Sequence, residues 1–75
     1  MITKKSELKG KYLKPKKMLR EERLKRELSA SYVANVIGID RRQYGLKEKG
    51  FYPFHDYEIS VICKALDIDK EVFFI

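Results

Sequence analysis

The chain has 75 residues, of which 37% are charged, and its formal net charge at pH 7 is +6. So short a chain forms one small domain that depends on tight helix packing, a partner subunit or both for its stability. One cysteine and one histidine exclude an internal disulfide framework and a Cys/His-rich metal site. No apolar run approaches the ~20 residues that cross a bilayer, and no secretory signal is evident, so we expect a cytoplasmic protein.

The basic residues are concentrated at one end of the chain. Residues 1–27 contain eleven Lys or Arg and four acids, whereas residues 51–75 contain two Lys or Arg and five acids. A basic N-terminal part and an acidic C-terminal part are typical of a protein that binds nucleic acid in one orientation. An anionic membrane surface is the other polyanion that this charge favours, but the first predicted helix lacks the broad apolar face that such binding needs.

Residues 1–14 are predicted to form a flexible basic arm, because they are interrupted by Gly10 and show no sustained apolar period. The arm either enters a neighbouring groove of DNA or stays solvated; its lysines include Lys4, Lys5, Lys9 and Lys11. Pro15 suits the first turn of a helix. We therefore expect a domain over residues 15–75, whose first helix covers about residues 15–27.

The middle of the chain predicts two short helices joined by a tight turn. Ser29 is a candidate N-cap for a helix over residues 30–37. The apolar face of that helix is assigned to Tyr32, Val33, Val36 and Ile37. Gly38 suits the left-handed position that ends a helix, and Asp40 is the candidate N-cap of a second helix over residues 41–49. Two helices on such a turn are the sequence form of a helix-turn-helix.

The remainder of the chain predicts a helix over about residues 55–66 and a final turn or short helix over residues 70–74. Asp56 and Glu58 fall in the first turn of the longer helix, where the helix dipole favours acids. The core face of this helix is Ile59, Ile62, Cys63 and Leu66. Because no segment alternates convincingly with period two, the predicted fold class is all-α, a compact bundle of about five short helices.

From Ser29 onwards the residues follow the spacing S/T-Q-x-x-x-A-x-x-x-G-[IV]-S-x-x-x-[IY]-S-x-x-E-x-G. The matching positions are Ser29, Ala34, Gly38, Ile39, Asp40, Tyr44, Glu48 and Gly50. Over about residues 16–75 the chain resembles the Cro and repressor type of helix-turn-helix proteins, also called XRE-like. The resemblance implies a lambda repressor-like DNA-binding domain of a phage-type or bacterial transcriptional regulator. It also implies that Glu48 pairs with Arg23, the alternative being that Glu48 is a solvated acid. From the helical spacing alone, Arg23 and Glu27 are predicted to form an i,i+4 pair.

Four residues depart from the family pattern. Ala30 stands where the family usually has a phosphate-contacting Gln, and Gly45 replaces a Ser at a cost of about 1 kcal/mol in helix propensity. Gly45 would in return let DNA approach closely. Leu46 occupies a position that is often polar and faces the bases, where it suits a thymine methyl group. Lys47 occupies a position that is often apolar, so its stem is expected to pack while its ammonium reaches solvent.

The resemblance places the helix over residues 41–49 in the major groove of double-stranded DNA, where its first residues reach base edges. The predicted base contacts are Arg41, Arg42, Gln43, Gly45 and Leu46. The predicted phosphate contacts are Ser29, Ser31, Lys47 and Lys49.

Two questions about partners stay open. Phe73, Phe74 and Ile75 either cap the core or form a two-fold interface, and a palindromic operator favours a homodimer through this C-terminal segment. Gly45 and Leu46 on the reading face leave room for a second class of function, a protein-interaction module such as an antitoxin or anti-repressor. The chain has no Gly-rich phosphate loop, no Ser/His/Asp set and no metal constellation, so we expect neither an enzyme nor a cofactor.

Overall fold

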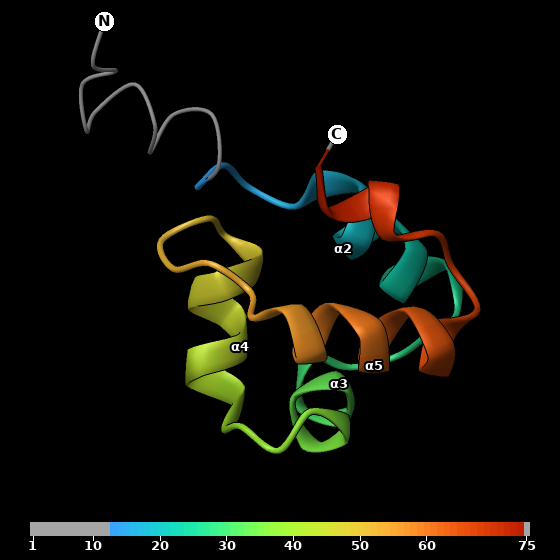
Figure 1. Cartoon of the computed structure of the whole chain (residues 1–75). Coiled ribbons are helices and arrows are strands. Elements are labelled where there is room, and N and C mark those ends of the chain that lie inside the picture. The colour runs from blue at the N-terminus through green and yellow to red at the C-terminus, as the bar shows by residue number, and fades with distance from the viewer. Residues whose placement is uncertain (1–12, 75) are drawn as a thin grey trace, which may run out of the picture.

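The computed structural model describes residues 13–74, which form four α-helices and a 3₁₀ turn (Figure 1). The elements are α2 (Lys17–Lys25), α3 (Ala30–Val36), α4 (Arg41–Glu48), α5 (Asp56–Leu66) and η1 (Lys70–Phe73). Each predicted helix is present with its ends moved by at most two residues, and the all-α prediction is confirmed. The four lysines assigned to a basic arm, Lys4, Lys5, Lys9 and Lys11, lie outside the described residues.

The helices enclose one core, and α5 runs across its middle. In the view of Figure 1, α3 lies on one side of α5, α2 and η1 lie on the other, and α4 stands at the end where α5 begins. Tyr44 of α4 packs edge-on against Phe54, and Phe54 packs edge-on against Phe73 of η1, with ring centroids 6.0 and 5.1 Å apart. The buried hydrophobic residues are Leu19, Val33, Ala34, Ile37, Tyr44, Phe54, Ile62, Leu66 and Phe73.

Both helices that flank the turn, α3 and α4, are capped at their N-termini. The Ser29 hydroxyl accepts a hydrogen bond from the Tyr32 amide and caps α3, as predicted. Gly38 has a φ of +75°, the left-handed conformation that glycine adopts without a steric cost. Asp40 then caps α4 by accepting from the Gln43 amide at 2.7 Å. The chain therefore leaves α3 and enters α4 within four residues, with both helix starts satisfied.

Gly50 is required by a close backbone approach at the other end of α4. Its φ is +92°, and a Cβ there would lie 2.5 Å from the carbonyl carbon of Lys14. The backbone amide of Lys16 also donates to the carbonyl of Glu48 at 2.8 Å. The segment before α2 is thus held against the end of α4, which fixes α4 relative to the body of the domain.

The structure corrects the predicted apolar face of α3. Tyr32 is 51% exposed, while Val33 and Ala34 are buried. The face of α3 that α4 and α5 cover is therefore centred one residue later than predicted, which leaves Tyr32 in solvent.

The C-terminal apolar segment is divided between the core and the surface. Phe73 is 1% exposed and packs in the core, whereas Phe74 is 60% exposed. Ile75 lies outside the described residues. Of the two alternatives for this segment, Phe73 follows the first, since it packs in the core, while Phe74 presents its ring to solvent. The homodimer stays a prediction.

Candidate nucleic-acid interface

The first turn of α4 lies at the surface. Arg41, Arg42 and Gln43 are all exposed, and the cap on Asp40 starts the helix immediately before them. Since the cap already satisfies the Gln43 amide, the side chains of this turn are available to an external ligand. The structure thus places three of the predicted base contacts at the surface; the base contacts themselves stay predictions.

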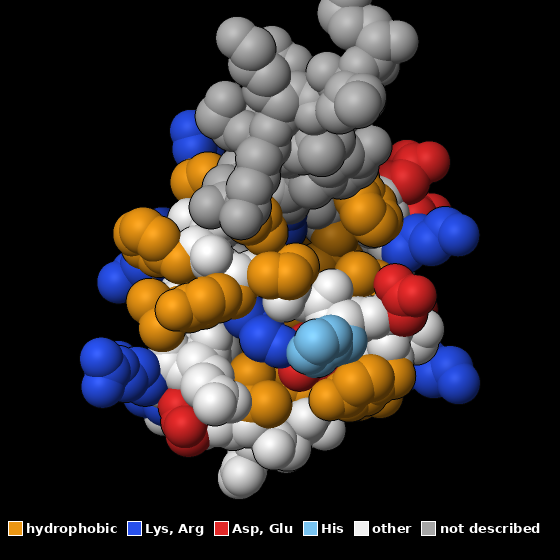
Figure 2. Space-filling model, turned by 60° about the vertical axis from the view of Figure 1, so that its left-hand side comes forward, with side chains coloured by type: hydrophobic (Ala, Val, Ile, Leu, Met, Phe, Trp, Pro, Cys, Tyr) orange, Lys and Arg blue, Asp and Glu red, His pale blue; other side chains and the backbone are white. Residues whose placement is uncertain are grey.

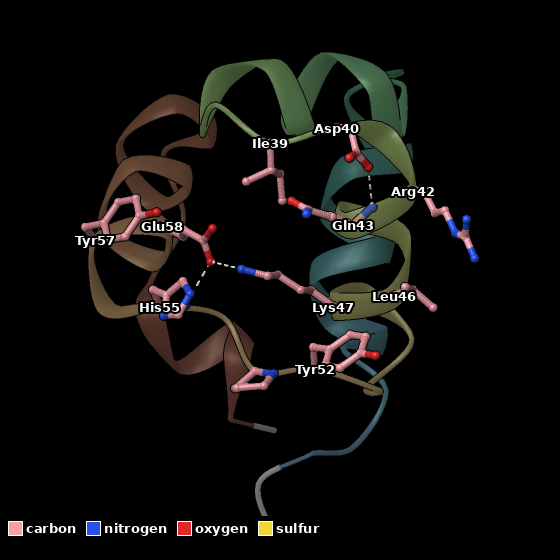
Figure 3. Close-up of a pocket in the computed structure, with 11 residues that line it drawn as sticks. Ile39, Asp40, Arg42, Gln43, Leu46, Lys47, Tyr52, His55, Tyr57 and Glu58 are labelled. Carbon is pink, nitrogen blue, oxygen red and sulfur yellow. Dashed lines mark hydrogen bonds and ion pairs between the residues drawn. The ribbon is translucent and has the colours of Figure 1, made fainter.

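The side chains of α4 divide between two sides of the helix. Figure 3 shows Gln43 and Lys47 pointing toward a hollow between α4 and the beginning of α5. Arg42 and Leu46 also line this hollow, but their side chains point away from its centre. A second hollow lies on the other side of α4, against α2 and the start of α3. The protruding helix α4 is therefore a ridge with a hollow along each flank.

We call the hollow against α2 the basic hollow. Its lining includes Arg20, Arg41, Arg42, Gly45, Leu46 and Lys49. Among residues 13–74, four of these cations, Arg20, Arg41, Arg42 and Lys49, have no acidic side chain within ion-pair distance. Their charge is uncompensated, so this flank of α4 favours an anionic ligand.

We call the other hollow the aromatic hollow, because Tyr52, His55 and Tyr57 line it. The rings of His55 and Tyr57 are stacked, with centroids 5.8 Å apart and planes only 5° from parallel. Phe51, Tyr52 and Tyr57 are each more than half exposed. In Figure 2, which brings α4 and the following loop forward, hydrophobic side chains gather over this face, one Lys or Arg side chain lies beside the histidine at its centre, and the others lie toward its edges.

Arg23 and Glu48 form a buried, two-pronged ion pair that ties α2 to α4. The Nε and Nη2 atoms of Arg23 donate to the two carboxylate oxygens of Glu48 at 3.0 and 3.1 Å. The hydroxyl of Tyr44 donates to the same carboxylate at 2.6 Å, and Nη1 of Arg23 donates to the carbonyl of Leu28. The implied Arg23–Glu48 pair is confirmed. The predicted i,i+4 pair of Arg23 with Glu27 is wrong, because α2 ends at Lys25 and Glu27 lies beyond it with a φ of 57°.

The pKa values in this cluster shift in the directions that such contacts dictate. The hydrogen bonds from Arg23 to Glu48 raise the pKa of the guanidinium, against the opposing effect of burial. Burial, together with the hydrogen bond to Glu48, raises the pKa of the Tyr44 hydroxyl well above its usual range. Tyr44 therefore stays protonated and acts as a hydrogen-bond donor.

Lys47 forms a second buried ion pair, which the sequence did not predict. Its ammonium donates to Oε1 of Glu58 at 2.5 Å, and Glu58 is fully buried. The prediction that this ammonium reaches solvent is wrong, because α5 supplies a carboxylate beneath the surface. The pair uses one of the three N–H donors of Lys47 and holds its ammonium beneath the surface, and the phosphate contact of Lys47 stays a prediction.

Glu58 joins three parts of the domain through one oxygen atom. Its Oε1 accepts one hydrogen bond from the ammonium of Lys47 and another from the backbone amide of His55, the latter at 2.8 Å. The Oε2 atom is buried and accepts no hydrogen bond from any of residues 13–74. Glu58 was interpreted from the sequence only as a first-turn acid that suits the helix dipole, and its burial is what makes it a link between α4 and α5.

The remaining predicted phosphate contacts, Ser29, Ser31 and Lys49, are all exposed. The Ser29 oxygen accepts from the Tyr32 amide, which leaves its hydroxyl hydrogen free to donate to a phosphate. Arg20 also lines the basic hollow, although the sequence analysis did not select it. Its signal was weak, because α2 carries several exposed charges and sequence periodicity does not show which of them faces α4.

Other kinds of site find little support within residues 13–74. No group of three or more His, Cys, Asp or Glu side chains there is arranged to hold a metal ion. Over the same range no helix has the length and apolar character to cross a membrane. Burial raises the pKa of the half-buried Cys63 thiol, which makes it a poor nucleophile.

The arrangement of α3, its capped turn and the exposed α4 defines a helix-turn-helix domain. No protein-family model and no curated protein matches the chain. Among solved structures, the chain is similar to the restriction-modification controller protein C.AhdI from Aeromonas hydrophila. The two are 32% identical with a TM-score of 0.68, over 79% of this chain and 89% of that chain. The chain therefore belongs to the Cro/repressor-type (XRE-like) helix-turn-helix family, whose members are DNA-binding transcriptional regulators rather than enzymes.

Proposed function

We propose that this protein is a sequence-specific, double-stranded DNA-binding repressor that reads the major groove with α4. The observation that carries the proposal is the set of unpaired cations along the exposed half of α4, Arg41, Arg42 and Lys49, beside Arg20 of α2. Arginine can bond guanine O6 and N7 with two hydrogen bonds, and glutamine can do the same with adenine. Arg41, Arg42, Gln43 and Leu46 supply the base contacts in this proposal, and Ser29, Ser31 and Lys49 bind phosphates.

The protein acts in the cytoplasm and binds its operator as a homodimer, since two copies related by a two-fold axis match a palindromic site. Phe74 supports the dimer because its ring is exposed at the end of the chain. The likeness to a restriction-modification controller makes the upstream regions of restriction-modification genes the first operators to test.

The decisive experiment selects bound sites from a random duplex library with the wild-type protein and with Arg42→Ala. We expect the wild type to enrich one motif, with an affinity that falls steeply as salt rises. Arg42→Ala should relax the preference at one base position and cost about 1–3 kcal/mol there. Lys64→Ala is the matched control, because Lys64 is an exposed cation on α5 that lines neither hollow.

Two outcomes would contradict parts of this proposal. If Arg42→Ala weakens all sequences equally, Arg42 binds only phosphate. If the wild type binds no duplex even at low salt, the protein is instead an interaction module of the antitoxin or anti-repressor kind. The exposed rings of Phe51, Tyr52 and Tyr57 favour that second candidate, because large exposed apolar side chains that lie together mark protein-binding surfaces.

A further inference from the structure

We propose that the basic hollow receives the sugar-phosphate backbone of one DNA strand, with Gly45 in its wall and Arg20 of α2 as a phosphate ligand. This inference rests on the proposed function and assigns one flank of α4 to one strand. It adds Arg20 to the DNA-contacting residues. It also gives Gly45 a different role from reading a base, namely to let the strand lie close to the helix.

The case for Gly45 begins with what the protein itself requires of its glycines. Gly38 and Gly50 have positive φ values, and Gly50 also has no space for a Cβ. Gly45 differs from both, because it lies inside α4 without a positive φ, and a Cβ built on it would meet no heavy atom within 4 Å. Glycine inside a helix weakens that helix relative to alanine, so the fold gains nothing from it here. A glycine that weakens its own helix and is not required by packing is expected where a ligand comes close to the backbone.

The charges around Gly45 identify the ligand as an anion. Arg20, Arg41 and Lys49 line the same hollow without an acidic partner among the described residues. Two acids also line it: Glu48 is paired with Arg23, which lines the same hollow, and Asp40 caps α4. Counting Arg23, five cations face two acids, so the hollow presents a net positive charge to whatever enters it.

The position of the hollow points to a strand backbone rather than to base edges. A helix with its side chains is about 10–12 Å across, and the major groove is about 12 Å wide. When such a helix occupies the groove, its innermost face meets the base edges, and the sugar-phosphate backbones of the two DNA strands run along its two sides. The basic hollow is on the flank of α4, between that helix and Arg20 of α2.

The test compares Gly45→Ala and Arg20→Gln with wild type on two duplexes, the best selected site and an unrelated sequence of equal length. Affinity is measured over a series of salt concentrations, and the melting temperature of each variant is recorded. Lys64→Gln is the control, since it removes one exposed cation outside the hollow. Gly45→Ala should raise the melting temperature because alanine favours the helix. It should nevertheless weaken binding to both duplexes about tenfold, because its methyl group occupies space that the backbone needs.

Arg20→Gln should weaken binding to the two duplexes equally. It should also lower the slope of log affinity against log salt concentration by about 0.9, the value for one lost phosphate contact. Lys64→Gln should leave the affinity and the salt slope unchanged. A Gly45→Ala variant that binds both duplexes as wild type does would overturn the role of Gly45. A loss confined to the selected site, in either variant, would show a base contact and overturn the assignment of the hollow to the backbone. If the wild type binds neither duplex at low salt, the proposed function fails first and this inference fails with it.

Discussion

Two buried ion pairs at the end of α4 use adjacent residues and differ in how completely they are satisfied. Glu48 accepts three hydrogen bonds on its two oxygens, two from Arg23 and one from Tyr44. Glu58 accepts two hydrogen bonds, both on Oε1, and its buried Oε2 accepts none from the described residues. The first pair ties α4 to α2, and the second ties α4 to α5 and to the loop before it.

The difference shows what makes a buried charge stabilising. Removing a carboxylate from water is costly, and only good geometry with every oxygen hydrogen-bonded repays that cost. A guanidinium forms two parallel bonds to one carboxylate, whereas an ammonium acts as a point charge. We therefore expect the Arg23–Glu48 pair to contribute strongly to folding, and the Lys47–Glu58 pair to be replaceable by apolar side chains.

The largest effect is expected from Glu48→Gln. The substitution keeps the shape of the side chain but leaves the buried Arg23 without a counter-charge, at a cost of about 3–5 kcal/mol. Urea unfolding at pH 7 measures it. Glu22→Gln is the matched control, because Glu22 pairs with Lys25 and Arg26 at the surface, where the loss is about 0.5 kcal/mol. Equal losses in the two variants would refute a special role for the buried pair.

A smaller loss is expected from Lys47→Met. The variant keeps the packing of the long stem but leaves the buried Glu58 without its counter-charge, a loss that we place at the lower end of the range of about 3–5 kcal/mol for a broken buried pair. The backbone amide of His55 still donates to the same oxygen and limits the loss. The same urea series provides the comparison. A loss as large as that of Glu48→Gln would mean that the two pairs are equivalent.

These two pairs also show what the sequence can and cannot predict. The helices were predictable because their signals are local: Ser29 and Asp40 as N-caps and Gly38 as a stop all lie within one turn of the ends that they define. The Arg23–Glu48 pair was predictable only through the family resemblance, since 25 residues separate its members.

The Lys47–Glu58 pair had no such precedent, and each of its residues had a simple local interpretation. Lys47 fitted a solvent-reaching lysine, and Glu58 fitted a first-turn acid. Their pairing depends on how α5 packs against α4, which periodicity does not specify. The same limit applies to Arg20, whose place in the basic hollow follows from the packing of α2. It also applies to Tyr32, because a helix of only two turns does not show within one residue which of its faces is buried.

Tyr44→Phe tests the third hydrogen bond of the better-satisfied pair. Losing the hydroxyl that donates to Glu48 should cost about 1 kcal/mol at pH 7. The pKa of Tyr44 is raised in the folded protein, so its contribution to stability is complete below the unfolded value of about 10 and is lost as the pH rises above it. Between pH 9 and 11 the wild type should therefore lose stability more steeply than the variant. Parallel pH profiles would show that Tyr44 titrates normally.

The smallest effect is expected from the double variant Lys47→Met, Glu58→Met, which replaces the less satisfied pair by apolar side chains of similar length. It removes one positive and one negative charge, so the net charge is unchanged, and it also removes the buried Oε2 that has no hydrogen-bond partner among residues 13–74. Within the described part of the chain, the one group that loses its acceptor is the backbone amide of His55, an exposed residue at the start of α5. Its stability in urea should lie within about 1 kcal/mol of wild type, because apolar replacements of buried pairs are often neutral or stabilising. The corresponding change at Arg23 and Glu48 would also orphan the carbonyl of Leu28 and the hydroxyl of Tyr44, and should be far more damaging. If the two double variants lose equal stability, the number of satisfied hydrogen bonds does not distinguish the pairs.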